Sequence, residues 1–261
     1  MRSTINQSLK TSSKILMADF NLSKKIKVQK NQSNIVTKVD IKSEKAIIKI
    51  IESKYPKHNI IAEETGYKNK GSEYTWVIDP IDGTSNYANN IPWFGTLIAV
   101  LKNNKPLMAG AVLPFYKNYY FAQKNKGCFL NNKKISVSKE KNLKNILVAY
   151  SLDYKENFKE TKKATDILAK IVNNVRNIRS TNSLVDFLYT AEGKLGSCIF
   201  STTKIWDVAS PTLLIEEAGG KVTDIKGKKL NFKISEKDYQ KNYTFVASNK
   251  ALHSKIIKLL K

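Results

Sequence analysis

The stretch WVIDPIDGTSNYANNIPWFG, residues 76–95, constrains the fold most, because it ends an apolar run in a tight acidic turn. The run 76–78 predicts a buried strand, and Asp79 and Asp82 follow it on either side of a Pro-Ile pair. Such residues are common in ordinary turns, but two carboxylates this close repel one another unless a cation lies between them. The following Gly-Thr-Ser can lead backbone N–H groups into a helix start, which attracts anions. The turn therefore predicts adjoining sites for a divalent metal and a phosphate, as metal-assisted phosphoryl chemistry requires.

The order of the other segments predicts an α/β (α+β) protein with two halves. A strand-rich α+β half covers residues 1–142, and an α/β half covers 143–261. A loop with a short extended piece is expected at 31–40, and a hairpin turn at 131–132. Helices are expected at 1–23, 40–54, 157–172 and 251–260, and strands at 76–78, 96–101, 109–113, 119–122 and 146–150.

The composition indicates a globular protein without a membrane span. Hydrophobic residues make up 41% of the 261 residues, and the longest apolar runs are far too short to cross a bilayer. The N-terminus has no apolar signal region and no clear cleavage site, so we expect a cytoplasmic protein. Cys128 and Cys198 lie in apolar settings, which favours two reduced core thiols over a disulfide.

The formal charge of +23 raises the question of a polyanion partner. The lysines, however, are scattered along the whole chain, and the densest cluster, Lys24, Lys25, Lys27 and Lys30, is best interpreted as a solvated face. A nucleic-acid partner is therefore left open but unsupported by the sequence. The charge could still help to attract a phosphorylated substrate.

Three more acidic stretches could complete the site opened by the turn. Glu63 and Glu64 follow an apolar strand end, Asp207 stands at an expected helix N-cap, and Asp40 follows Thr37 at another helix start. Each has an ordinary explanation alone, because lone aspartates often only cap helices and paired glutamates usually face solvent. The four stretches together favour a shared carboxylate site.

These motifs resemble the inositol monophosphatase family of magnesium-dependent, lithium-sensitive phosphatases. The resemblance runs in order over nearly the whole chain, and the first motif is the most specific. It implies a layered αβαβα sandwich of the inositol monophosphatase and fructose-1,6-bisphosphatase type, with the active site where the two halves meet. The motifs are NIVTKVD at 34–40, AEE at 62–64, WVIDPIDGTSNY at 76–87, GCFLNNKKISVS at 127–138 and WDVASPTLLIEEAGGKVTD at 206–224.

The resemblance assigns the metal ligands position by position. Glu63, Asp79 and the backbone carbonyl of Ile81 would hold one Mg²⁺, and Asp79, Asp82 and Asp207 would hold a second, in a site of two or three ions. The first ion would lower the pKa of a bound water, and the second would stabilise the leaving alkoxide.

The resemblance also assigns groups around the water and the phosphate. Thr84, with Asp40 as its partner, would orient or deprotonate the attacking water, and Glu63 would help to fix it. The phosphate would bind the Gly83 and Thr84 amides beside Asp82, with Glu64 next to the ligand glutamate rather than a ligand itself.

The substrate side departs from the family pattern. In the stretch 179–193, Asn182 and Ser183 occupy the place of a small-residue motif that touches the substrate, and we expect both to bind it. Phe200 falls where inositol-cleaving members carry a glutamate, and an aromatic ring cannot accept a hydroxyl hydrogen bond as a carboxylate does. The sequence therefore predicts phosphate hydrolysis more firmly than it names the substrate.

Inositol monophosphate stays the first substrate hypothesis, and histidinol phosphate or fructose 1,6-bisphosphate is the alternative. A third hypothesis, motivated by the charge, is an RNA or transcription-complex binding protein on the same scaffold. The resemblance also implies a homodimer. His58 and His253 lie in polar stretches without a nucleophile motif and are interpreted as surface residues, and Trp206 is expected to pack beneath Asp207.

Overall fold

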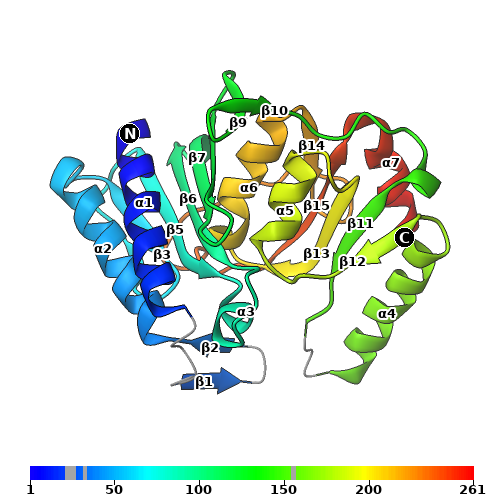
Figure 1. The fold of residues 1–261 in the computed structure, drawn as a ribbon, viewed down its shortest axis with the longest axis horizontal. Helices are drawn as coiled ribbons and strands as arrows, with labels where there is room; N and C mark the ends of the chain where they lie inside the picture. Colours follow the sequence, from blue (N-terminus) through cyan, green and yellow to red (C-terminus); the bar gives the residue numbers. More distant parts are fainter. Residues whose placement is uncertain (21–27, 32–33, 154–156) are drawn as a thin grey trace.

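The computed structural model places two mixed sheets side by side, with helices outside and between them (Figure 1). Lys24, Lys25 and Lys27 of the predicted lysine cluster lie outside the described residues, as does the side chain of Lys30. The structure describes residues 1–20, 28–31, 34–153 and 157–261.

The larger sheet, eight-stranded in the described part of the chain, is antiparallel except where β3 runs parallel to β5. Its order is β10 (Lys133–Ile135), β9 (Gly127–Leu130), β8 (Asn118–Gln123), β7 (Lys105–Leu113), β6 (Gly95–Lys102), β5 (Tyr74–Asp82), β3 (Asn59–Ala62) and β4 (Gly66–Lys68).

In the smaller sheet, β11 lies between β12 and β13 and is parallel to both. Beyond β13, β15 runs antiparallel to β13, and β14 runs antiparallel to β15. Its order is β12 (Asn177–Arg179), β11 (Leu147–Ser151), β13 (Ser197–Thr203), β15 (Tyr243–Asn249) and β14 (Gly220–Thr223), and a separate ribbon pairs β1 (Val28–Asn31) with β2 (Asn34–Val36).

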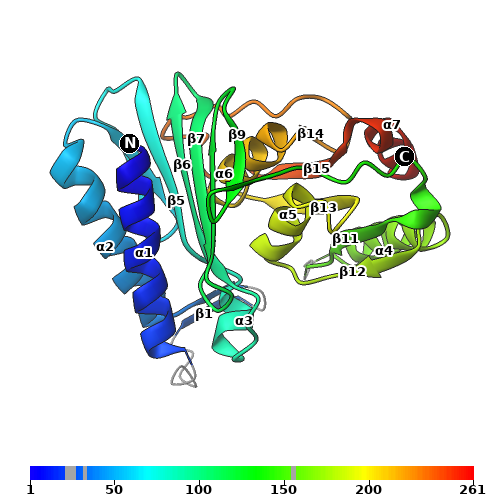
Figure 2. The ribbon, with the colours of Figure 1, turned by 45° about the horizontal axis from the view of Figure 1, so that its top comes forward.

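The helices complete five layers. Figure 2 shows α1 and α2 on the outer side of the larger sheet, α5 and α6 between the sheets, and α4 and α7 beyond the smaller sheet. This arrangement confirms the predicted αβαβα sandwich. The helices are α1 (Arg2–Asp19), α2 (Lys38–Lys54), α3 (Thr84–Ala88), α4 (Phe158–Val172), α5 (Leu184–Ala191), α6 (Ile205–Glu217) and α7 (Lys250–Leu259), with a short 3₁₀ turn at Leu143–Asn145.

The interior strand β5 is apolar at residues 76–78 because both of its faces are covered there. Trp76 and Ile78 pack against α1 and α2, whereas Val77 points to the opposite face, toward the core shared with α5 and α6. The continuous apolar run of the sequence is thus the signature of a strand buried on two sides. This burial holds the acidic end of β5 in one place.

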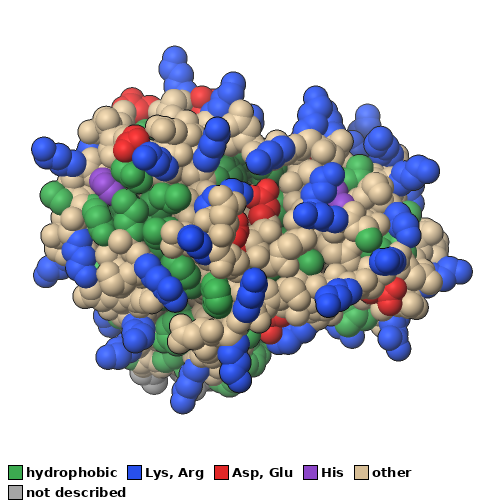
Figure 3. All heavy atoms as spheres, turned by 90° about the horizontal axis from the view of Figure 1, so that it is seen from above, with side chains coloured by type: hydrophobic (Ala, Val, Ile, Leu, Met, Phe, Trp, Pro, Cys, Tyr) green, Lys and Arg blue, Asp and Glu red, His purple; other side chains and the backbone are tan. Residues whose placement is uncertain are grey.

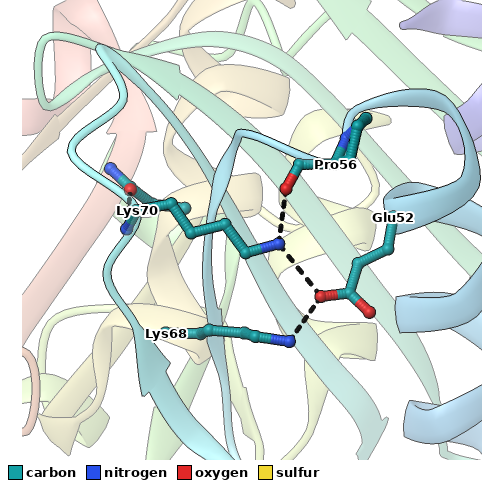
Figure 4. Close-up of polar contacts among 5 residues, drawn as sticks. Glu52, Pro56, Lys68 and Lys70 are labelled. Carbon is teal, nitrogen blue, oxygen red and sulfur yellow. Dashed lines mark hydrogen bonds and ion pairs between the residues drawn. The ribbon is translucent and has the colours of Figure 1, made fainter.

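The edge strand β4 is fastened to α2 by a charged contact (Figure 4). The Glu52 carboxylate accepts from Lys68 Nζ at 2.6 Å and from Lys70 Nζ at 3.1 Å, and Lys70 Nζ also donates to the Pro56 carbonyl at 2.6 Å. These side chains are partly exposed, so each pair adds little stability by itself. Their consequence is positional, because the end of β4 and the residues that follow it are held close to the last turns of α2.

Several sequence predictions are confirmed and others shift. The hairpin turns at Asn131 and Asn132, both with positive φ, and Cys128 and Cys198 are buried free thiols. The second helix begins at Lys38 rather than at residue 40, because Thr37 caps it. The proposed boundary near residue 142 falls between the strands of the two sheets, but a division into two domains stays a prediction.

Among the described residues, no helix is long and apolar enough to cross a membrane. A cytoplasmic location stays a prediction.

Candidate metal and phosphate site

The turn after β5 is built by the strand itself. β5 continues to Asp82, with its pairing to β6 interrupted between Asp79 and Asp82. The Pro80 carbonyl within this interruption accepts from Thr96 Oγ1 at 2.8 Å. Gly83 then takes φ = +86° before α3 starts, a backbone conformation that favours glycine. The two carboxylates are therefore fixed by backbone geometry rather than by flexible loops.

Three aspartates converge at this turn. One carboxylate oxygen from each of Asp79, Asp82 and Asp207 lies within 4.8 Å of the others. Asp79 is 2% exposed, and its Oδ1 has no hydrogen-bond partner among the described residues. Burial raises the pKa of the Asp79 carboxyl well above its ordinary range, and the nearby charges of Glu63 and the other two aspartates raise it further.

Glu63 completes this carboxylate group from the end of β3. Its backbone N–H donates to the Ile78 carbonyl at 3.3 Å, and its carboxyl group lies close enough to that of Asp79 for each to affect the pKa of the other. Burial raises the pKa of Glu63 well above normal, and the charge of Asp207 adds to this effect. A Mg²⁺ ion prefers oxygen ligands, and it would offset the repulsion between these carboxylates. It would also give a partner to the Asp79 oxygen that has none among the described residues.

Asp207 enters the site from α6, but not as the expected N-cap. Lys204 is the N-cap residue, and Asp207 is the third helical position, where its Oδ2 accepts from the Lys204 backbone N–H at 2.6 Å. The N-cap prediction was therefore wrong by three positions, because the carboxylate reaches back to the cap. Burial raises the pKa of Asp207 to about 7. Trp206 is buried in the core between the sheets, as expected.

Asp40 and Thr84 meet at the other side of the turn. Asp40 Oδ2 accepts from the Thr37 N–H at 2.7 Å, which completes a capping box on α2. The Thr84 hydroxyl lies 2.8 Å from the Ile81 carbonyl oxygen and 3.3 Å from Asp40 Oδ1. Burial raises the pKa of Asp40, and the Thr37 hydrogen bonds partly offset the rise. Asp40 thus caps its helix and also faces the turn, so the structural and functional interpretations are compatible.

Glu44 is a residue that the sequence analysis missed. It lies one helical turn after Asp40 on α2 and is fully buried. Its carboxylate oxygens accept from the Glu64 and Thr65 backbone N–H groups, both at 2.9 Å. Glu44 therefore holds the turn that carries Glu63. Its spacing from Asp40 places both acids on one face of α2, which is the signal that could have found it.

The substrate-side loop packs directly on the turn. The Leu184 backbone N–H donates to Asp82 Oδ1 at 2.5 Å, and Asn86 Nδ2 donates to the Thr181 carbonyl at 2.9 Å. Ser183 is buried, and its hydroxyl caps α5 by accepting from the Val185 N–H at 3.4 Å. Asn182, in contrast, is exposed and has φ = +49°. The loop that carries both predicted residues lies against the turn, but the Ser183 hydroxyl is already engaged as the cap of α5.

Phe200 belongs to the core. Its ring stacks on Phe187 at a centroid distance of 4.2 Å, and only 6% of the residue is exposed. The missing family glutamate is therefore replaced by packing, not by another polar contact at the same position.

The histidines differ from each other. His253 is buried between the Thr223 and Ser248 hydroxyls, at 2.8 and 3.0 Å, so the surface interpretation was wrong for it. Burial lowers the pKa of His253 to about 4, and the positive charge of Lys221 adds to this effect. His58 is half-buried and accepts from Trp76 Nε1 at 3.1 Å. Both are structural residues away from the carboxylates.

Two further acids lie near the site and were also missed. Asp186, on α5, is 1% exposed; burial raises its pKa to about 6, and its Oδ2 accepts from the Thr181 N–H at 3.3 Å. Asp153 follows β11, and its charge contributes to the raised pKa of Asp82 and of Asp207. Neither stands in a recognisable motif, so only the folded chain reveals them.

Comparison with known proteins agrees with this geometry. The family model described as "Inositol monophosphatase family" matches residues 1–261. A fructose-1,6-bisphosphatase/inositol-1-monophosphatase from Aquifex aeolicus is 30% identical over 249 residues, which cover 95% of this chain and 90% of that protein. The Nus factor SuhB of Xylella fastidiosa is 33% identical over 202 residues, or 77% of this chain and 72% of that protein.

A solved structure shows the same fold. The extragenic suppressor protein SuhB from Bartonella henselae superposes with a TM-score of 0.91 at 25% identity, covering 100% of this chain and 98% of that chain. The family is one of metal-dependent phosphatases, and the match extends over the whole chain rather than over one motif. The chain belongs to the inositol monophosphatase family.

Proposed function

We propose that the protein is a Mg²⁺-dependent phosphomonoesterase that hydrolyses a small phosphorylated polyol, with inositol monophosphate as the first candidate. The observation that supports this most is the convergence of Asp79, Asp82 and Asp207 within 4.8 Å, together with a buried Asp79 oxygen that no described residue hydrogen-bonds. A purely structural cluster of this kind would be destabilising, because buried carboxylates without a cation cost free energy.

The proposed metal ligands come from three elements. Glu63, Asp79 and the Ile81 carbonyl would hold one ion, and Asp79, Asp82 and Asp207 a second, in a site of two or three Mg²⁺ ions. When bound, such ions supply a water of lowered pKa and positive charge beside the leaving oxygen. Glu44 would keep Glu63 aimed at the site by holding its turn.

The remaining groups would act on the water and the phosphate. Thr84 would orient the attacking water through its hydroxyl, and Asp40, at 3.3 Å from that hydroxyl, would receive the proton. The Gly83 and Thr84 amides at the start of α3 would bind the phosphate oxygens, with Asp82 alongside. Asn182, exposed at the rim, and Ser183, beneath it, would contact the alcohol part of the substrate.

The experiment that tests the proposal is phosphate release by the purified protein with Mg²⁺ and with EDTA. The substrates are inositol 1-phosphate, histidinol phosphate, fructose 1,6-bisphosphate and adenosine 3',5'-bisphosphate, and a lithium series tests the expected inhibition. We expect Mg²⁺-dependent turnover with inositol 1-phosphate preferred. A preference for histidinol phosphate or fructose 1,6-bisphosphate would select the alternative substrate. Equal turnover with EDTA would refute the metal mechanism.

A second candidate function is binding to RNA or to a transcription complex. The observations that favour it are the +23 charge and a relative described as a Nus factor. Figure 3 shows lysine and arginine side chains spread over the face drawn, without one dominant basic patch. Titration of labelled RNA at increasing salt tests this candidate, because phosphate contacts make affinity fall steeply with salt. Absence of binding at low salt would eliminate direct RNA binding.

The homodimer is part of the proposal as well. Exposed apolar side chains, Ile91, Trp93, Phe115 and Tyr116, lie in the segment after α3 and in the β7–β8 turn, and the Phe115 and Tyr116 rings are 5.3 Å apart. Exposed aromatic groups of this kind are typical of association surfaces. Light scattering should show a dimer in the wild type and more monomer after Trp93→Lys.

A further inference from the structure

The carboxyl ends of three parallel strands meet at one edge of the smaller sheet. β11 is paired in parallel with both β12 and β13, and Ser151 is in register with Phe200. The chain leaving β11 reaches Asp153, the chain leaving β12 reaches Asn182, and the chain leaving β13 reaches Asp207. Ligands of open α/β sheets usually bind at this edge.

Asp153 is linked to the metal side through its neighbours. Its Oδ1 accepts from Asn182 Nδ2 at 3.1 Å, and Asn182 Nδ2 also donates to the Leu152 carbonyl at 3.0 Å. Two residues after Asn182, the Leu184 N–H holds Asp82. The electrostatic effect of Asp153 on Asp82 and Asp207 agrees with this proximity. Asp153 therefore lies at the rim of the carboxylate site.

The free capacity of Asp153 suits a hydrogen-bond donor. Its Oδ2 accepts from Ser151 Oγ at 2.8 Å and its Oδ1 from Asn182, so each oxygen has one donor within the part of the chain that the structure describes, and a carboxylate oxygen can accept a second. The residue is half-buried, which leaves it within reach of a ligand. A second phosphate at this rim would be repelled, whereas a hydroxyl or an ammonium group would be attracted.

We propose that Asp153, held by Asn182, binds a donor group on the alcohol part of the substrate and so selects monophosphates whose alcohol carries a hydrogen-bond donor. The neighbouring strand β11 thus supplies the carboxylate that Phe200 on β13 cannot. This inference rests on the proposed function for the position of the phosphate. The shared chemistry is a donor beside the phosphate ester, a hydroxyl of a polyol or the ammonium of an amino alcohol.

The test compares Asp153→Ala and Asp153→Asn with the wild type on inositol 1-phosphate, histidinol phosphate and phenyl phosphate, which has no hydroxyl donor. The readout is the ratio of kcat/KM for each alcohol phosphate to kcat/KM for phenyl phosphate. This ratio cancels any effect of the lost charge on the metal ligands, because that effect is common to all substrates. Asp166→Asn, an exposed acid paired with Lys162 on α4, is the matched control.

We expect Asp153→Ala to lower the inositol ratio by about tenfold or more, mainly through KM, since a hydrogen bond to a charged group is lost. Asp153→Asn keeps an acceptor, so it should cost a hydroxyl substrate less than an ammonium substrate. The substrate whose kcat/KM ratio falls more in Asp153→Asn therefore shows whether the bound donor is a hydroxyl or an ammonium group. Equal losses on all substrates, leaving the ratios within about twofold, would overturn the inference.

Binding separates this inference from the proposed function. With Ca²⁺ replacing Mg²⁺, calorimetry should show tighter binding of inositol 1-phosphate or histidinol phosphate than of phenyl phosphate, and Asp153→Ala should abolish that preference. A preference that Asp153→Ala abolishes, in a protein that hydrolyses none of these substrates with Mg²⁺, would refute the phosphatase proposal and support the role of Asp153. A wild type that hydrolyses these substrates but binds them without that preference would support the phosphatase proposal and refute the role of Asp153.

Discussion

The turn at the end of β5 and the rim at the end of β11 contribute to one site in different ways. The turn supplies two carboxylates, a carbonyl, a hydroxyl and two amides from residues 79–84 alone. The rim is assembled from residues 152–153, 180–184 and 204–207, each leaving a different strand. In the proposed site, the phosphate chemistry would therefore depend on a local motif, and the choice of alcohol would depend on segments that are far apart in the sequence.

The two regions also differ in how their polar groups are satisfied. At the turn, Asp79 has a buried oxygen without a partner in the described ranges, and burial raises the pKa of Asp79 and of its neighbours Glu63 and Asp207. At the rim, Ser183 is used as a helix cap and Phe200 as core packing, whereas Asn182 and Asp153 bond to each other. Beside the rim, Asp186 Oδ1 is likewise buried without a partner among the described residues. The turn differs because its unpartnered oxygen lies among three carboxylates that converge within 4.8 Å, so the proposed cation site is easier to recognise than the proposed substrate site.

The largest effect should come from breaking the turn with Asp82→Asn. Loss of one negative charge weakens the proposed second metal position while the amide keeps the size of the side chain, so we expect kcat/KM to fall by about a hundredfold or more. Phosphate release at saturating Mg²⁺ measures it. Asp166→Asn should be as active as wild type, and an Asp82→Asn protein with full activity would rule out the two-metal assignment.

Converting the rim to the family pattern with Phe200→Glu should fail. The glutamate would lie against Phe187 in the core, and losing the aromatic packing alone costs about 3 to 5 kcal/mol of unfolding free energy. Urea unfolding measures the loss, with Phe200→Leu as a milder control. A stable Phe200→Glu protein with improved inositol phosphate turnover would show instead that this position opens to the substrate.

The charge at the turn should make the metal-free protein less stable as pH rises. The folded pKa of Asp207 is raised to about 7 from an unfolded value of 3.8, so the folded state binds more protons and loses stability as pH rises through about 7. His253 acts in the opposite direction but only below its unfolded value of 6.5.

Thermal unfolding in EDTA at about pH 6.5 and about pH 8 isolates the carboxylates, and we expect a lower Tm at the higher pH. Mg²⁺ should remove most of the difference by stabilising the charged forms. Asp79→Asn should weaken the pH dependence, since one source of repulsion is gone. A higher Tm at pH 8 than at pH 6.5 in EDTA would contradict this account of the turn.

The sequence predicted the turn well because its information is local. Apolar residues, a Pro, a Gly and two carboxylates stand in one stretch, and the resemblance extended this to the layered fold and to Glu63 and Asp207. Glu44 escaped notice because its role depends on α2 lying against the β3–β4 turn. Phe200 looked like a substituted ligand, since a strand buried on both faces does not reveal which way its side chains point.

The smallest effect in this series compares two glycines with positive φ. Gly83 has φ = +86°, and a Cβ there would lie 2.5 Å from the Trp93 carbonyl oxygen, whereas Gly71 has φ = +70° and open space around it. Gly71→Ala should cost about 1 kcal/mol from backbone strain alone, and Gly83→Ala should cost that plus a shift of the turn. Urea unfolding gives the stabilities, and kcat/KM should fall only for Gly83→Ala, because the shift displaces the Thr84 amide and hydroxyl. Equal stability losses with unchanged kcat/KM would show that the turn tolerates a displaced backbone, and the contrast between a rigid turn and an adaptable rim would be lost.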